Sequence, residues 1–198
     1  MNGFPRLHEY LSRLPLGLDS YPECQTKGMV LASALAEFPF HDSWNELPPE
    51  IRNRIVSPPL VTEWISSALT NAVQCVVADT YHPTDREILL HNRARTLKVA
   101  NSAAYRTLAR VAGVRILIRG AVRMHGMFQR GTDFRLVGAA DYAVTLYLEH
   151  PPFLHGGCIH LANEAVFGTL IETAGGRSVS VKMTESSARR AVYAVTWR

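Results

Sequence analysis

Arginine residues at helical spacing are the feature of this sequence that most directly suggests binding chemistry. Arg115, Arg119 and Arg123 recur at every fourth position, and Arg106 and Arg110 do the same upstream. Residues four apart share one face of an α-helix, so each set would form a row of guanidinium groups. The guanidinium group is a planar multiple donor that suits phosphate or carboxylate. The rows predict an anion-binding surface; the alternative is a solvated helix face, or one paired with acidic residues.

The charge distribution allows the same two interpretations. Residues 86–135 hold 11 Lys and Arg against 2 Asp and Glu, whereas residues 1–85 hold 5 against 10. A basic middle segment can bind small anions or nucleic acid. It can equally face the acidic segment across one fold or one dimer interface. No recognition-helix pattern or aromatic stacking set accompanies the arginines, so nucleic-acid binding ranks second.

Histidine and cysteine residues supply the other candidate ligand-binding groups. His155, Cys158 and His160 surround a glycine pair where a helix is predicted to start. His155 and His160 would lie about 140° apart around a helix axis, so they would not converge on one metal ion. The sequence therefore predicts no metal site. A single histidine, His125 or His155, is the candidate for axial ligation of a haem iron.

No motif points to catalysis, and no catalytic residue is predicted. The patterns HExxH, GxSxG, SxxK, GxGxxG and GxxxxGK[ST] are all missing. The three cysteines, Cys24, Cys75 and Cys158, form no CxxC pair, which favours reduced thiols with Cys75 buried in an apolar helix. An enzyme of unknown reaction is the third interpretation, and it would require a ligand beside Cys158 and His160.

Apolar periodicity indicates the elements that must position these residues. Helical spacing predicts helices near residues 7–14, 25–38, 49–56, 61–78, 88–112 and 114–128. Thr84 and Glu87 match a helix capping box, Asn101-Ser102 marks an interruption, and Gly113 marks a helix end. After Gly131 the period changes to two, which predicts a hairpin over 133–148, a helix over 159–174 and a second hairpin over 178–197.

These elements predict an α+β fold with a single domain spanning residues 1–198. A helical part, about 1–130, precedes a hairpin-helix-hairpin part, about 131–198, which forms a four-stranded antiparallel sheet. Trp64, on the apolar face of helix 61–78, and Trp197, on the last strand, are expected to be buried.

Sequence composition also yields predictions about location and assembly. The 198-residue chain has no apolar run of membrane-spanning length and no signal-peptide pattern at its start, so we expect a cytoplasmic protein without a membrane partner. Surplus apolar helix surface predicts a homodimer through residues 60–128 and not through the sheet edge. Asp79 or Glu63 of the other chain would then pair with the arginines.

Three short segments resemble a known family. GLDSYPECQTKG at 17–28, the pair Phe38-Pro39 and YAVTW at 193–197 resemble an uncharacterised family of short paralogous myxobacterial proteins. Its element order is similar to sensor domains of the four-vinyl-reductase and haem-nitric-oxide-binding type. The resemblance implies a dimeric α+β domain with a ligand pocket between helices and sheet. The Tyr-x-Ser-x-Arg triplet of the nitric-oxide sensors is missing, which counts against haem.

The leading functional hypothesis is a non-catalytic regulatory or sensor protein that binds a small ligand or a protein partner. Its candidate ligand-binding residues are Arg115, Arg119, Arg123, His125, His155, Cys158 and His160. The first alternative is a nucleic-acid or nucleotide binder that uses the arginine rows. The sequence identifies no cofactor.

Overall fold

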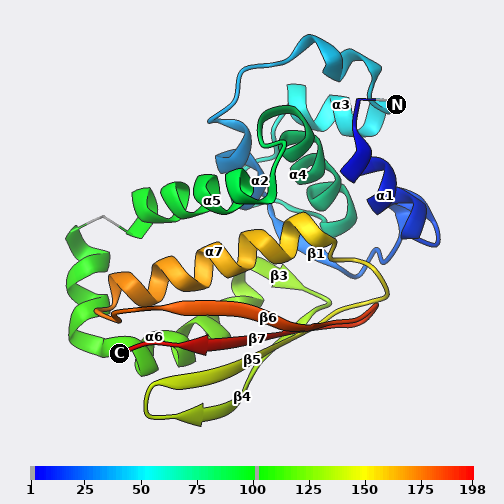
Figure 1. Ribbon diagram of the computed structural model, residues 1–198. Helices are drawn as coiled ribbons and strands as arrows, with labels where there is room; N and C mark the ends of the chain where they lie inside the picture. Colours follow the sequence, from blue (N-terminus) through cyan, green and yellow to red (C-terminus); the bar gives the residue numbers. More distant parts are fainter. Residues whose placement is uncertain (1–2, 101–102) are drawn as a thin grey trace. The chain divides into compact units, whose positions relative to one another are not determined.

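The computed structural model describes residues 3–100 and 103–198, and the side chains of these residues except 99–100 and 103–112 (Figure 1). Its α-helices are α1 (Pro5–Arg13), α2 (Gly28–Leu35), α3 (Pro49–Val56), α4 (Ser67–Tyr81), α5 (Asp85–Ala100), α6 (Ala103–Phe128) and α7 (Gly157–Thr173). Its strands are β1 (Gln25–Lys27), β2 (Trp64–Ser66), β3 (Gln129–Arg130), β4 (Asp133–Ala140), β5 (Ala143–Glu149), β6 (Ser180–Ser186) and β7 (Arg190–Thr196). The predicted α+β class, helices first and then hairpin-helix-hairpin, is confirmed.

The chain divides into two compact units. The first contains Met1–Pro83, Gly126–Thr132 and His150–Ile159, and the second contains Thr84–His125, Asp133–Glu149 and His160–Arg198. The single domain expected from the sequence therefore stays a prediction. Within the described residues, no helix combines the length and apolarity needed to cross a membrane.

The first unit contains a small sheet that the sequence did not predict. Its strand order is β2-β1-β3, and all pairs are antiparallel. Strands β1 and β2 occupy the starts of the helices expected at 25–38 and 61–78. Each strand has only three residues, too few to show a period of two, and Thr26 pairs with the distant Ile65. Pairing across the fold therefore overrides the local helical pattern.

Trp64 differs from the prediction for the same reason. It belongs to β2 and not to the helix, and it is only half-buried. The Nζ of Lys27 lies 4.1 Å and the Cζ of Arg130 lies 3.8 Å from its ring centroid. The indole is thus held by two cation–π contacts and not by a helix core.

Helix α4 is the central helix of the first unit, and one of its faces carries three polar side chains. Asn71, Cys75 and Asp79 follow one another at intervals of four residues, which places them on one side of the helix. The Asp79 carboxylate accepts hydrogen bonds from the backbone N–H groups of Arg6 (3.2 Å) and Leu7 (3.1 Å). It thereby caps the N-terminus of α1, where unpaired N–H groups favour a negative charge.

This cap corrects part of the dimer hypothesis. The Asp79 side chain is fully buried within its own chain and also forms an ion pair with Arg6. Glu63 forms an ion pair with Arg54 of the same chain. Both carboxylates therefore already have partners within their own chain.

The second unit contains the predicted four-stranded sheet. Its strand order is β4-β5-β7-β6, and each neighbouring pair is antiparallel. Side chains of β5 alternate between buried and half-buried, as the period of two predicted. Helices α6 and α7 contribute Ile118 and Ile171 to the core that covers this sheet. Trp197, which directly follows β7, belongs to the same core, so its predicted burial is confirmed.

Helix boundaries in this unit also follow the sequence. The Thr84 backbone N–H donates to the Glu87 carboxylate at 2.9 Å, and the Glu87 N–H donates to the Thr84 hydroxyl at 3.3 Å, which is the predicted capping box. Gly113 has φ 74°, so the backbone leaves helical geometry there as expected, although helix continues on both sides. Asn101 and Ser102 lie outside the described residues.

Candidate ligand-binding groove

A groove of about 560 Å³ lies in the second unit. We call it the groove. Its lining residues come from the start of the second part of α6, the β4–β5 turn, the end of α7 and the chain end after β7. They are Gly113, Val114, Arg115, Ile116, Arg119, Asp141, Tyr142, Ala174, Gly175, Gly176, Trp197 and Arg198.

Helix α6 presents two different faces along this stretch. Val114, Ile118 and Val122, four residues apart, pack toward the sheet core. Arg115 and Arg119, each one position later, are exposed and line the groove. The predicted row of arginines on one helix face is therefore present from Arg115 onward, because the 3.6-residue period separates it from the apolar row.

The opposite wall is shaped by Trp197 and the glycine pair that ends α7. Gly175 has φ 97°, a conformation that turns the chain after the helix. A Cβ atom on Gly176 would lie 2.8 Å from the Cγ2 of Ile171 and 3.4 Å from the Cβ of Trp197. Only glycine lets the backbone pass this close to the helix and the indole.

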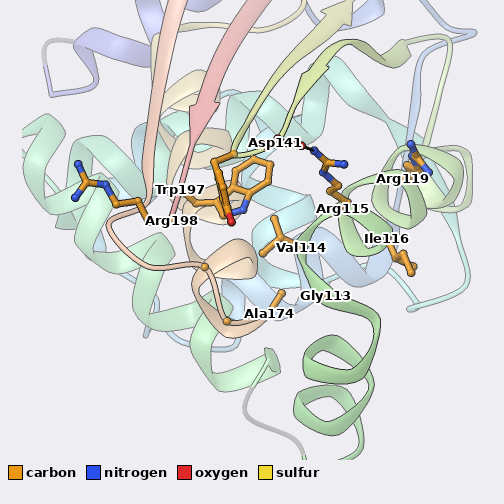
Figure 2. A pocket seen from close by; sticks show the side chains of 12 residues that line it. Gly113, Val114, Arg115, Ile116, Arg119, Asp141, Ala174, Trp197 and Arg198 are labelled. Carbon is orange, nitrogen blue, oxygen red and sulfur yellow. Dashed lines mark hydrogen bonds and ion pairs between the residues drawn. The ribbon is translucent and has the colours of Figure 1, made fainter.

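The two lining arginines of α6 differ in their partners. Arg115 donates to the Asp141 carboxylate at 2.7 Å and to the Ala140 carbonyl at 2.9 Å. Figure 2 shows Trp197 with Arg198 to one side and the Arg115–Asp141 pair to the other. Within the part of the chain that the structure describes, Arg119 forms no ion pair. Arg119 is thus a groove cation with its charge available.

A smaller cavity of about 160 Å³ shares the same two arginines. Its wall is formed by Arg115, Ile118 and Arg119 from α6 and by Leu136, Ala139 and Val144 from β4 and β5. Both guanidinium groups therefore stand beside apolar side chains as well as solvent. This combination of a cation with an apolar wall suits an anion that also carries apolar surface.

The remaining arginines of the predicted rows lie elsewhere. Arg123 is exposed on the same face of α6 but does not line the groove. Arg106 and Arg110 lie outside the residues whose side chains are described. The structure thus brings together two of the predicted anion-binding residues, Arg115 and Arg119.

The predicted histidines do not join the groove. His125 packs its ring against Phe134, with 5.3 Å between ring centroids, and burial lowers its pKa. His155, which precedes α7, has its ring centroid 4.8 Å from that of His150. His160 places its Nδ1 atom 2.9 Å from the Tyr193 hydroxyl. None of these three histidines lines the groove.

Cys158 also has a partner that the sequence did not indicate. Its Sγ lies 3.1 Å from the Sγ of Cys75, and both side chains are buried. The described contact of Cys158 is therefore with another buried thiol.

Sequence reasoning missed several residues that complete the groove. Trp197 was expected only as a core residue, and Asp141, Tyr142 and Gly176 were not among the candidate ligand-binding residues. The aromatic and acidic residues at 141–142 could have drawn attention. Their proximity to α6, however, depends on packing between segments far apart in the chain.

Comparisons with known proteins identify the fold. No protein-family model and no curated protein matches this chain. Solved H-NOX structures do match, each over 87% of this chain. A variant of the Fe(II) unliganded H-NOX protein from K. algicida matches with a TM-score of 0.56, 10% identity and 96% coverage of that protein. An oxygen-binding H-NOX domain related to soluble guanylate cyclases, in its oxygen complex, matches with a TM-score of 0.56, 10% identity and 95% coverage of that protein. An H-NOX structure from work on heme distortion matches with a TM-score of 0.58, 8% identity and 95% coverage of that protein. The likeness establishes the fold.

The groove does not suit the haem that this fold family implies. Haem iron is held in proteins by histidine, cysteine, methionine or tyrosine. The groove holds no histidine, cysteine or methionine, and its one phenol, Tyr142, is 62% exposed. His125 and His155, the two axial candidates, line none of the cavities described above. The residues of the groove therefore do not fit a haem.

Proposed function

We propose that this chain is a non-catalytic sensor or regulatory domain that binds a small, largely apolar anion in the groove. The observation that carries the proposal is that Arg119, a cation with no described ion pair, lines the same groove as the Trp197 indole and the aliphatic side chains of Val114 and Ile116. An indole and aliphatic groups favour the apolar body of a ligand, and a guanidinium group favours its carboxylate, sulfonate or phosphate.

Arg115 has a second part in this proposal. Its ion pair with Asp141 is exposed, and exposed ion pairs contribute little stability. A ligand anion can therefore replace Asp141 as the partner of Arg115 at small cost. The β4–β5 turn, which carries Asp141, is then the element that responds to the ligand.

The wider parts of the proposal come from the sequence and from analogy. The fold shared with H-NOX domains supports a sensor role by analogy alone, because one fold can carry several functions. We further propose membership of the myxobacterial paralogous family, a cytoplasmic location, a homodimer and a protein partner that receives the signal.

The proposal is tested with anilinonaphthalene sulfonate, an aromatic sulfonate whose fluorescence rises in apolar sites. We expect Arg119→Ala to weaken its binding to the folded protein about tenfold, equal to about 1.4 kcal/mol. Arg123→Ala is the matched control, since Arg123 lies one helical turn further along the same face and outside the groove. Equal binding by both variants and the unaltered protein would contradict the proposal.

A second candidate function, nucleic-acid binding, is favoured by one observation. Arg119 and Arg123 are both exposed on one face of α6, and neither forms an ion pair within the described residues. Phosphate backbones would engage both, with an affinity that falls steeply with salt. Fluorescence anisotropy with labelled duplex and single-stranded DNA at two salt concentrations separates the functions. Loss of DNA binding in both arginine variants supports this second function, whereas loss of dye binding in Arg119→Ala alone supports the groove.

A further inference from the structure

Two buried thiols of the first unit lie in direct contact. The Sγ atoms of Cys75, on α4, and Cys158, in the first turn of α7, are 3.1 Å apart. Both are free cysteines, separated by 83 positions in the chain. Two sulfur atoms this close need only a small displacement to reach bonding distance.

Neighbouring hydrogen bonds hold the two thiols in place. The Tyr10 hydroxyl on α1 and the Asn71 amide on α4 both donate to the Leu154 carbonyl, at 2.9 and 2.8 Å. The Tyr21 hydroxyl donates to the Pro152 carbonyl at 2.9 Å. The segment before α7 is thus tied to α4 one turn from Cys75, so the contact between the thiols is built into the packing.

We propose that Cys75 and Cys158 form a reversible disulfide site that joins α4 to the first turn of α7. The oxidant is a small-molecule disulfide such as oxidised glutathione. This site is independent of the groove and of the function proposed for it.

The order of the reaction follows from exposure and hydrogen bonding. Cys158 is 8% exposed and Cys75 is 1% exposed, so Cys158 meets the oxidant first. The hydrogen bond with Cys158, followed by burial, raises the pKa of Cys75, which therefore keeps its proton at this stage. The Cys158 thiol gives its proton to solvent, and its sulfur attacks one sulfur of the small disulfide and releases the other half as a thiolate.

The second step closes the protein disulfide. Cys75 gives its proton to solvent or to a released thiolate, and its sulfur attacks the Sγ of Cys158. The S–S bond to the small molecule breaks and the second thiolate leaves. In total the protein loses two hydrogens and gains one S–S bond, while the small disulfide is reduced to two thiols.

Cys24 provides the internal control. It is buried, and its thiol donates to the Gly131 carbonyl at 3.2 Å. Burial, together with the charge of Glu23, raises its pKa to about 11. Cys24 is therefore a protonated thiol whose described hydrogen-bond acceptors are oxygen atoms, and it should survive the same treatment.

The experiment treats the reduced, full-length protein with oxidised glutathione, quenches it with acid, and counts maleimide-reactive thiols after denaturation. We expect the three thiols to fall to one, with an intact mass lower by two hydrogens and a proteolytic fragment in which Cys75 and Cys158 are linked. In Cys24→Ser the count should fall from two to none. A dithiol reductant should restore the starting counts.

Single variants of the pair test the order of events. Cys75→Ser should retain one glutathione on Cys158, because no second sulfur can displace it. Retention of all three thiols in the unaltered protein, or a link that involves Cys24, would overturn the proposal. These two outcomes require no substitution in the pair, so a variant that fails to fold does not obstruct the test.

Discussion

The Nδ1 atom of His160 lies 2.9 Å from the hydroxyl of Tyr193, and both side chains are buried. The Asn163 amide donates to the same hydroxyl at 3.3 Å. Burial is the main cause of the raised pKa of Tyr193, so this hydroxyl stays protonated at any physiological pH. A polar contact thus fixes α7 to β7, a central strand of the sheet.

Removal of this hydroxyl should destabilise the protein. Tyr193→Phe removes the hydroxyl that His160 and Asn163 both contact. Each side chain then lacks this hydrogen-bond partner, which costs about 1–3 kcal/mol. Denaturant unfolding measures the change. Tyr142→Phe, at an exposed position, is the control and should change stability by less than about 0.5 kcal/mol. Equal stability of the two variants would contradict the importance of the contact.

The two tryptophans should respond differently to truncation. Trp197→Ala removes a side chain that is 6% exposed from the core of the second unit and should cost about 3–5 kcal/mol. Trp64→Ala removes a half-buried ring with two cation–π contacts and should cost about 1–2 kcal/mol. Thermal or denaturant unfolding of both variants measures the two losses of stability. A larger loss of stability for Trp64→Ala would contradict the assignment of Trp197, and not Trp64, to a buried core.

The cap that Asp79 provides for α1 is testable with a nearly isosteric change. Asp79→Asn removes the charge and turns one acceptor oxygen into a donor that faces backbone N–H groups, so we expect a loss of about 1–3 kcal/mol. Glu9→Gln removes a carboxylate from an exposed ion pair with Arg13 on α1 itself. That control should change stability by less than about 1 kcal/mol.

The lowered pKa values of two histidines predict a loss of stability in mild acid. Burial lowers the pKa of His125 and of His150 below 6.5 in the folded protein, although Asp133 and a bond to the Pro151 carbonyl partly oppose it. The unfolded chain therefore binds more protons once the pH falls below about 6.5, and stability decreases from there downward. Unfolding midpoints at about pH 7.5 and about pH 5.5 measure the decrease.

Variants identify the source of this pH dependence. His125→Gln and His150→Gln together should flatten the decrease, whereas His8→Gln, at an exposed position of α1, should leave it unchanged. An undiminished decrease in the double variant would assign the effect to other groups.

The predicted homodimer is tested by sedimentation. Exposed apolar side chains do lie within residues 60–128, among them Leu90 and Met124. We expect a mass near twice 22.0 kDa at micromolar concentration. Leu90→Glu or Met124→Glu should shift the protein toward monomer, while Val137→Glu on β4 should not. A monomer in the unaltered protein would contradict the prediction.

Local sequence pattern predicted the parts of the fold that depend on near neighbours. The alternation through β5 and the apolar spacing of α7 repeat often enough to be recognised. The pairing of Thr26 with Ile65 has no such local pattern, because three-residue strands derive their stability from partners far along the chain.

The same distinction applies to the sites. The spacing of Arg115 and Arg119 is a local feature and was predicted. The presence of Trp197 in the same groove depends on packing between β7 and α6, which are far apart in the chain. The sequence predicted Cys75 as a buried thiol and Cys158 as a ligand-binding residue, and only tertiary structure could bring the two together.

The irregular outer strands of the four-stranded sheet have a consequence for aggregation. β4 changes register between Leu136 and Gly138, and β6 does so between Met183 and Glu185. A flat, regular edge offers its free N–H and C=O groups to another sheet, which is how fibrils elongate. Because each edge here is interrupted, strands of a second molecule cannot add along its full length. The unit can therefore remain dispersed at concentrations where a regular sheet of this size would polymerise.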